Sequence, residues 1–121
     1  MWTQGLNPEQ SQAVQHSYGP LLVLAGAGSG KTTVLVARTG RIIADGLARP
    51  DQICVLTFTN KAARELKHRV LNKLGERAKG LWAGTFHSFG LKILRTNHEL
   101  AGLPSHFGVI DQSDSQALIK E

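Results

Sequence analysis

The sequence contains a single cysteine, Cys54, among its 121 residues. One thiol excludes a disulfide framework and a metal site built from several thiolates. Cys54 stands in an apolar run, and we expect it to be a small core residue. The longest apolar stretch, residues 21–25, is far below the roughly 20 residues that cross a bilayer. The first residues also lack the basic and apolar regions of a signal peptide. We therefore expect a soluble, cytoplasmic globular protein that does not enter a membrane.

Acidic residues are scarce in one part of the chain. The whole sequence has 14 Lys and Arg against 9 Asp and Glu, a net charge of +5. Residues 61–95 hold nine basic and two acidic residues, whereas residues 101–121 hold one basic and three acidic residues. Such a basic block is typical of a surface for a polyanion or of a solvated helix face, and charge alone does not decide between them.

Polar residues mark the expected helix starts. Asn7 suits an N-cap, Pro8 suits the first helical position, and Gln10 stands where a capping-box side chain reaches back. Asn60 is expected to cap a second helix, which Gly75 closes. Ser113 opens a possible last helix. These residues predict helix boundaries but not how the helices pack.

Short apolar runs alternate with segments of helical periodicity. The runs predict strands at 21–25, 53–58 and 81–86, and the periodic segments predict helices over about 31–45, 60–74 and 87–100. The segment 107–111 is ambiguous. Alternation of this kind predicts an α/β fold with a parallel sheet and helices packed on its faces.

A glycine-rich segment carries the strongest chemical signal. Residues 25–32 match the phosphate-loop pattern except for Ala25, which replaces its first glycine. Small residues let backbone N–H groups surround a phosphate, and the following helix points its positive end at the anion. Lys31 can reach the terminal phosphates and the Thr32 hydroxyl can bind Mg²⁺, so both are candidate catalytic residues. A chance glycine-rich turn is the alternative, but the flanking strand and helix patterns argue against it. The predicted nucleotide-binding residues in this segment and at the position after it are Ala25, Gly26, Ala27, Gly28, Ser29, Gly30, Lys31, Thr32 and Thr33.

Hydrolysis requires more than this loop. Phosphate-loop enzymes also use an acidic group on magnesium and a group that orients the attacking water. After the loop, a single apolar run ends in a carboxylate, at Asp111, and that residue is better explained as a helix cap or turn residue. The sequence thus predicts half of an active site.

Four segments together resemble the UvrD/Rep-like superfamily 1 DNA helicases. They are the adenine-reading motif at 6–14, the phosphate loop at 25–32, the first DNA-contacting motif at 56–66 and the next such motif at 84–88. The family itself has Ala at the first loop position. The resemblance implies an incomplete RecA-like P-loop NTPase fold, a three-layer parallel sheet with helices on both faces. Residues 1–88 would be the N-terminal part of the ATP-binding motor domain, and 89–121 would begin a helical inserted subdomain.

The same resemblance implies ATP and Mg²⁺ as cofactors, with Gln10 reading the adenine, and single-stranded DNA as the partner. An amide can both donate to and accept from an adenine edge; the alternative for Gln10 is the capping box alone. Aromatic residues at the carboxyl ends of parallel strands can stack on bases, and nearby hydroxyls and N–H groups can hold phosphates. For Phe58 the alternative is a core residue, and for His87 a structural one. The implied DNA contacts are Phe58, Thr59, Asn60, Lys61, Thr85, Phe86, His87 and Ser88.

Two departures from the family limit these implications. Many members carry an Arg that packs on the adenine where this chain has Thr33. The chain also ends before the acidic pair that binds magnesium and before the second motor domain with its arginine finger. We therefore expect a fragment that binds nucleotide without efficient turnover.

The parent would be an ATP-dependent DNA helicase that translocates 3′ to 5′ on single strands and unwinds duplexes in replication or repair. One alternative is a stand-alone, non-catalytic module that binds nucleotide or DNA. A second is a small phosphate-loop kinase, which would explain the loop but not the segments around Phe58 and His87.

Overall fold

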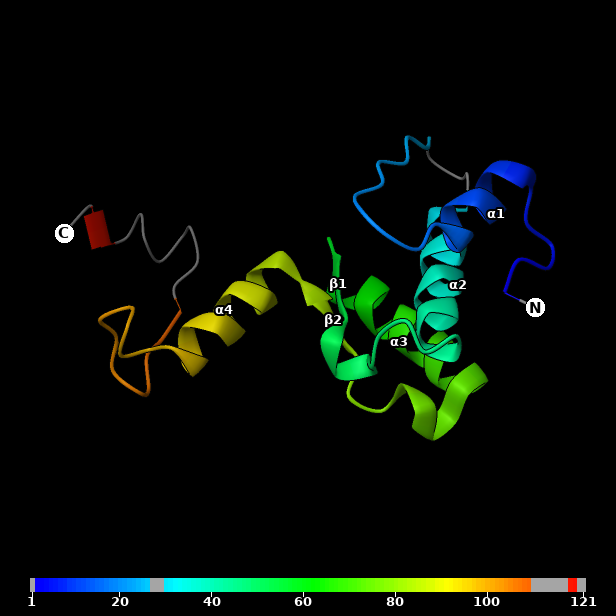
Figure 1. Ribbon diagram of the computed structural model, residues 1–121. Coiled ribbons are helices and arrows are strands. Elements are labelled where there is room, and N and C mark those ends of the chain that lie inside the picture. The colour runs from blue at the N-terminus through cyan, green and yellow to red at the C-terminus, as the bar shows by residue number, and fades with distance from the viewer. Residues whose placement is uncertain (1, 27–29, 110–117, 120–121) are drawn as a thin grey trace. The chain divides into compact units, whose positions relative to one another are not determined.

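The computed structural model describes residues 2–26, 30–109 and 118–119. These residues divide into two compact units, 1–86 and 87–121. The helices and strands are shown in Figure 1; they are α1 (Pro8–Gln15), α2 (Lys31–Ala44), η1 (Pro50–Gln52), β1 (Cys54–Thr57), α3 (Asn60–Leu74), η2 (Gly75–Ala78), β2 (Trp82–Thr85) and α4 (Phe86–Thr96).

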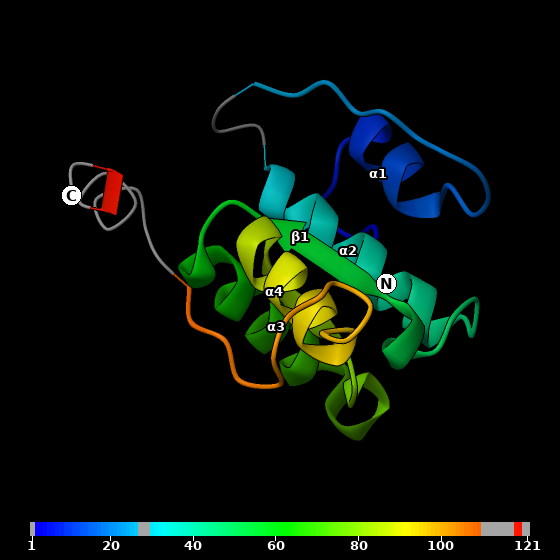
Figure 2. The ribbon, with the colours of Figure 1, turned by 90° about the vertical axis from the view of Figure 1, so that its left-hand side faces the viewer.

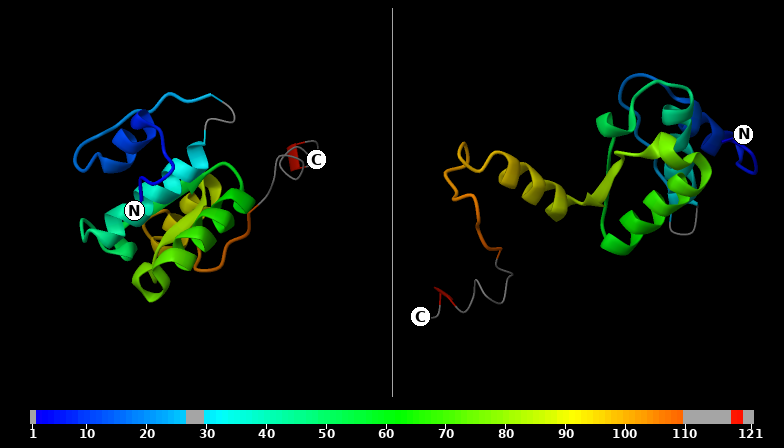
Figure 3. Two further views of the ribbon diagram at one scale, coloured as in Figure 1. Left: turned by 90° about the vertical axis from the view of Figure 1, so that its right-hand side faces the viewer. Right: turned by 90° about the horizontal axis from the view of Figure 1, so that it is seen from below.

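The first unit is built on a two-stranded parallel sheet. Strands β1 and β2 pair in parallel from Cys54 opposite Trp82 to Thr57 opposite Thr85. Helix α3 connects the two strands and packs against both, and α2 lies beside α3 (Figures 2 and 3). The predicted α/β class and parallel pairing are therefore confirmed. The full three-layer sheet stays a prediction.

The core of this unit lies between the strands and the two helices. Val55 of β1 is buried, whereas its neighbours Cys54 and Leu56, which face the other side of the strand, are exposed and half-buried. Side chains from α2, α3 and the segment 78–81 close around Val55; they are Val36, Ile43, Leu66, Val70, Ala78 and Leu81. One face of the sheet is thus covered within the unit.

The expectation that Cys54 is a core residue was wrong. Its side chain is exposed because it begins β1 on the face opposite the covered one. Alternation along a strand sends successive side chains to opposite faces, so an apolar neighbourhood in sequence does not by itself bury a residue.

Residues 21–25 also differ from the sequence-based prediction. The segment forms no strand, and Leu22 and Leu24 are 82% and 88% exposed. A parallel strand is stabilised by ladder hydrogen bonds to its neighbours. Residues 21–25 join neither β1 nor β2 in the two-stranded sheet. The apolar composition of residues 21–25 therefore led to the prediction of a buried strand, but the segment has no neighbouring strand to pair with.

In the first unit the helix boundaries were predicted well, with one wrong cap. Oδ1 of Asn7 accepts from the Gln10 N–H at 2.8 Å, and Oε1 of Gln10 accepts from the Asn7 N–H at 3.0 Å, which confirms the capping box. At α3 the N-cap is Thr59, whose Oγ1 accepts from the Ala62 N–H at 3.1 Å. Asn60 was wrongly expected in that role: it is the first helical residue, because the backbone is still extended at Thr59.

The N-terminal segment packs on the surface of α2. The indole of Trp2 lies so close to Gly40 that a side chain at position 40 would overlap the ring. The Lys73 ammonium stands 5.0 Å from the centroid of the same ring. Gly40 therefore serves close packing, although glycine is a poor residue for a helix interior.

The second unit contains most of α4. The helix predicted over 87–100 begins one residue earlier and ends at Thr96. At the end of the helix, the Ile93 carbonyl accepts from both the backbone N–H of Asn97 at 2.9 Å and its side chain at 3.0 Å. Residues 107–109 are irregular, and the possible helix start at Ser113 lies outside the described residues. In the parts of the chain that the structure describes, no helix is long and apolar enough to cross a membrane.

Candidate nucleotide and DNA site

The end of the predicted phosphate loop leads directly into α2. Gly30 has φ of 82°, a left-handed conformation that glycine adopts without strain, and its carbonyl accepts the first helical hydrogen bond, from the Val34 N–H at 3.0 Å. Lys31 and Thr32 occupy the exposed first turn. A helix start of this kind directs N–H groups and a partial positive charge outward, which suits an anion. Ala27, Gly28 and Ser29 lie outside the described residues.

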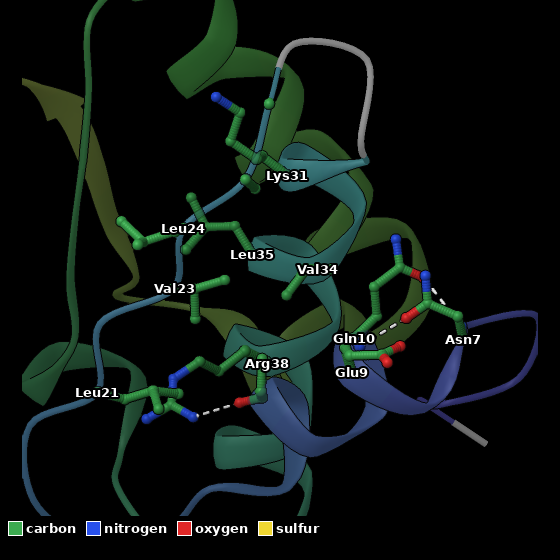
Figure 4. Close-up of a pocket in the computed structure, with 13 residues that line it drawn as sticks. Asn7, Glu9, Gln10, Leu21, Val23, Leu24, Lys31, Val34, Leu35 and Arg38 are labelled. Atoms are coloured by element: carbon green, nitrogen blue, oxygen red, sulfur yellow. Dashed lines mark hydrogen bonds between the residues drawn. The ribbon is translucent and has the colours of Figure 1, made fainter.

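A cavity of about 710 Å³ lies beside this helix start (Figure 4). Ala25, Gly26 and Lys31 contribute to its wall, together with Gln10 from α1. The remaining lining residues are mostly apolar; they are Asn7, Glu9, Ala13, Leu21, Val23, Leu24, Val34, Leu35 and Arg38. An apolar cavity with few polar groups is the common form of a site for a small organic ligand.

Two roles were predicted for Gln10, one in the capping box of α1 and one in contact with the adenine. Its Oε1 accepts from the Asn7 N–H at 3.0 Å, as the capping box requires. Its Nε2 lies 3.0 Å from the position that a Cβ atom on residue 30 would occupy. A carbonyl oxygen has two lone pairs, so the cap does not use up the acceptor capacity of Oε1. The geometry thus brings the predicted adenine-reading residue to the start of α2.

Thr33 is placed differently from the rest of its segment. It lies outside the lining of the large cavity and instead borders a smaller one, of about 170 Å³, between α2 and α3. The Arg69 guanidinium donates to the Thr33 hydroxyl at 3.5 Å. Its predicted contact with the nucleotide stays a prediction.

Two aromatic residues follow the paired strand ends. Phe58 comes directly after β1, and Phe86 comes directly after β2. Because the last residues of the two strands, Thr57 and Thr85, are opposite each other, both aromatic residues lie at the same edge of the sheet. The ring centroids are 6.1 Å apart and the planes are tilted by 45°. Phe58 is 93% exposed and Phe86 is 56% exposed. The alternative of a core role for Phe58 is therefore wrong: the chain leaves the sheet before this residue and carries it into solvent.

The remaining predicted DNA contacts differ in exposure. Lys61 and Asn60 are exposed in the first turn of α3, and Thr59 is exposed beside them. The Thr59 hydroxyl caps α3, and the Thr85 side chain is only 9% exposed. His87 and Ser88 follow Phe86 in the first turn of α4. Of this set, the structure brings Phe58 and Phe86 into contact, and it presents Lys61 at the surface.

Magnesium chemistry is incomplete in the described residues. Thr32 offers a hydroxyl oxygen at the helix start, which suits Mg²⁺. No group of three or more His, Cys, Asp or Glu side chains in residues 2–26, 30–109 and 118–119 comes together as a metal site. Asp111, the one carboxylate considered from sequence, lies outside those residues. Among the described residues, Thr32 would therefore supply one oxygen ligand to Mg²⁺.

Sequence reasoning missed the contacts that hold the first helix in place. Arg38 and Arg41 of α2 both donate to backbone carbonyls at the end of α1. Their three-residue spacing places them on one face of the helix, but that spacing does not reveal their partners. The packing of Trp2 on Gly40 was missed for the same reason.

Comparison with known proteins completes this picture. The family model for the UvrD/REP helicase N-terminal domain matches residues 6–121. The chain belongs to the UvrD/REP helicase family. It is 44% identical over 116 residues to the ATP-dependent DNA helicase PcrA of Staphylococcus aureus (strain Mu50), which covers 96% of this chain. The PcrA of Staphylococcus epidermidis (strain ATCC 12228) is 44% identical over 118 residues, or 98% of the chain. The match spans 16% of the length of each relative. The UvrD-like chain is thus similar to a small part of an ATP-dependent DNA helicase.

Proposed function

We propose that this chain is the N-terminal, ATP-binding part of a DNA helicase that translocates 3′ to 5′ on single-stranded DNA and unwinds duplexes. Family membership and the similarity to PcrA support the helicase assignment. The direction, the unwinding and the binding of ATP by this fragment are the proposed part. On this account the fragment binds nucleotide but depends on the rest of the helicase for efficient turnover.

The observation that carries the proposal is the exposed pair Phe58 and Phe86 at the carboxyl ends of the two parallel strands. Ligands of open parallel sheets bind at this edge. Exposed rings can stack on bases without reading their identity, as a protein that moves along a strand requires. The basic residues that follow on α3, with Lys61 first, add attraction for the phosphates.

The nucleotide half of the proposal rests on the start of α2. Lys31, in the first turn, would hold the terminal phosphates, and Gln10, beside Gly30, would contact the base. We place the adenosine in the cavity of about 710 Å³ that these residues share. A small kinase would use the same helix start, but a kinase function does not explain why Phe58, at the edge of the sheet, is 93% exposed.

DNA-stimulated ATP turnover by the full-length protein that contains this chain tests the proposal. We expect single-stranded DNA to raise the turnover rate and Lys31→Ala to abolish it. Lys79→Ala removes an exposed lysine that lies outside both sites and is the matched control. Turnover that Lys31→Ala leaves unchanged would contradict the nucleotide site. An ATP turnover rate that single-stranded DNA does not change would contradict the helicase assignment.

A further inference from the structure

Two arginines of α2 hold the carboxyl end of α1. Nη1 of Arg38 donates to the carbonyl of Ala13 at 2.7 Å and to that of His16 at 2.6 Å. Nη1 of Arg41 donates to the carbonyl of Gln15 at 3.0 Å. Figure 4 shows the guanidinium of Arg38 turned toward α1 and bonded to a carbonyl there. Three backbone carbonyls at one helix end thus receive side-chain donors from the neighbouring helix.

These bonds meet a physical need of α1. The last carbonyls of a helix have no partner within it, and a cation there also interacts favourably with the helix dipole. Helix α1 has only eight residues, a length that is marginal without tertiary support. Only Ala13 and Val14 of α1 are buried. With so little apolar contact, the position of α1 on α2 depends strongly on the arginines.

The opposite end of α1 carries Gln10. Its Nε2 lies 3.0 Å from the position that a Cβ atom on residue 30 would occupy, at the start of α2. Gln10 is five residues before Gln15, a distance of about 8 Å along a helix. A tilt of α1 by about 10° at its carboxyl end would therefore move Gln10 by more than 1 Å, and hydrogen bonds tolerate only a few tenths of an ångström. The arginine contacts thus control where the amide of Gln10 stands.

We propose that Arg38 is a positioning residue for nucleotide-base selection: it fixes α1 so that the amide of Gln10 stands at the start of α2. This inference rests on the proposed ATP site. An amide that donates and accepts is complementary to the adenine edge, which offers an acceptor nitrogen and an amino donor. Guanine has an oxygen acceptor in place of that amino group. Correct placement of Gln10 therefore favours ATP over GTP, whereas the phosphate contacts of Lys31 serve both nucleotides equally.

Arg38 acts through α1 rather than as a ligand of the nucleotide. Its guanidinium lines the cavity, but Nη1 is already committed to the carbonyls of Ala13 and His16. Loss of Arg38 should therefore change the discrimination between bases more than the binding of phosphates. A residue that merely stabilised the fold would weaken both alike.

The test measures dissociation constants of ATP, GTP and inorganic tripolyphosphate, each with Mg²⁺, for this chain and its variants. Arg38→Ala removes the two bonds to α1, and Arg38→Lys keeps a cation that can make one. Arg49→Ala is the control, since Arg49 is an exposed arginine whose guanidinium pairs with Asp51 at 3.1 Å. Hydrogen exchange of the backbone amides is measured without nucleotide. Exchange in α1 reports how firmly this helix is held, and exchange in α2 and α3 shows whether the rest of the chain stays folded.

We expect the wild-type chain to prefer ATP and Arg38→Ala to lower the ATP-to-GTP affinity ratio at least fivefold. Tripolyphosphate affinity should change less than twofold, and Arg38→Lys should recover part of the ratio. The α1 amides should exchange at least tenfold faster in Arg38→Ala, with α2 and α3 unchanged. If Arg38→Ala leaves the ATP-to-GTP affinity ratio unchanged, or if it lowers the affinity for all three ligands equally, the positioning role of Arg38 is overturned. Neither result contradicts the proposed ATP site. A wild-type chain that binds no ATP contradicts the proposed function and the inference with it.

Discussion

The ring of Phe58 lies 6.1 Å from the ring of Phe86, and each follows the last residue of a parallel strand. The strands are in register at Thr57 and Thr85, so the next residue of each chain segment reaches the same edge of the sheet. Two aromatic side chains far apart in sequence therefore form one exposed surface. Stacking surfaces of this kind bind single strands with little preference for sequence.

Phe58→Ala should weaken binding of a single-stranded oligonucleotide. Base stacking on an aromatic side chain contributes about 1–3 kcal/mol, so the dissociation constant should rise by about 5- to 150-fold. Fluorescence anisotropy with a labelled oligonucleotide measures the change, and Phe58→Trp should retain affinity. Tyr18→Ala is the matched control, since Tyr18 is 81% exposed and lies outside the predicted DNA contacts. Equal affinity in Phe58→Ala and the wild type would remove Phe58 from the DNA site.

Thr59→Ala should destabilise the chain, whereas Asn60→Ala should not. The Thr59 hydroxyl accepts from the Ala62 N–H at 3.1 Å, and loss of an N-cap costs about 1 kcal/mol. Asn60 is already helical, and alanine has the higher helix propensity at such a position. Urea denaturation of the two variants gives the difference in unfolding free energy. If Asn60→Ala is the more damaging substitution, the assignment of the cap to Thr59 is incorrect.

Gly40→Ala should destabilise the wild-type chain but stabilise a chain that carries Trp2→Ala. A methyl group at position 40 overlaps the indole of Trp2, and overpacking costs about 1–3 kcal/mol. Without the ring, alanine gains about 1 kcal/mol of helix propensity over glycine. The four chains of this double-mutant cycle can be compared by thermal unfolding. A melting temperature that Gly40→Ala raises whether or not Trp2 is present would contradict the close packing of the indole on Gly40.

Local features were predictable from the sequence. The capping box between Asn7 and Gln10 depends on residues three apart, and the glycine that ends α3 with a positive φ is Gly75. Both follow from short-range rules of backbone geometry. The choice between Thr59 and Asn60 as a cap was missed because it depends on where β1 releases the chain.

Non-local features could not be predicted in the same way. The segment 21–25 is apolar, but strand formation depends on a neighbouring strand, which local composition does not specify. The partners of Arg38, on a helix 22 or more residues away, follow from packing alone. The start of α2 was the exception, because the sequence places it correctly at Lys31. The roles of Lys31 and Thr32 in binding phosphate and Mg²⁺ stay predictions.

Strand separation by the full-length protein is the decisive measurement for the proposed helicase function. Duplex substrates with either a 3′ or a 5′ single-stranded tail should be incubated with ATP and Mg²⁺, and the released strand should be measured over time. We expect the wild type to unwind the 3′-tailed duplex and the Lys31→Ala variant to leave it double-stranded. Unwinding from the 5′ tail alone would contradict the proposed direction. The absence of ATP-dependent strand release from either substrate would contradict the assignment of this chain to a DNA helicase motor.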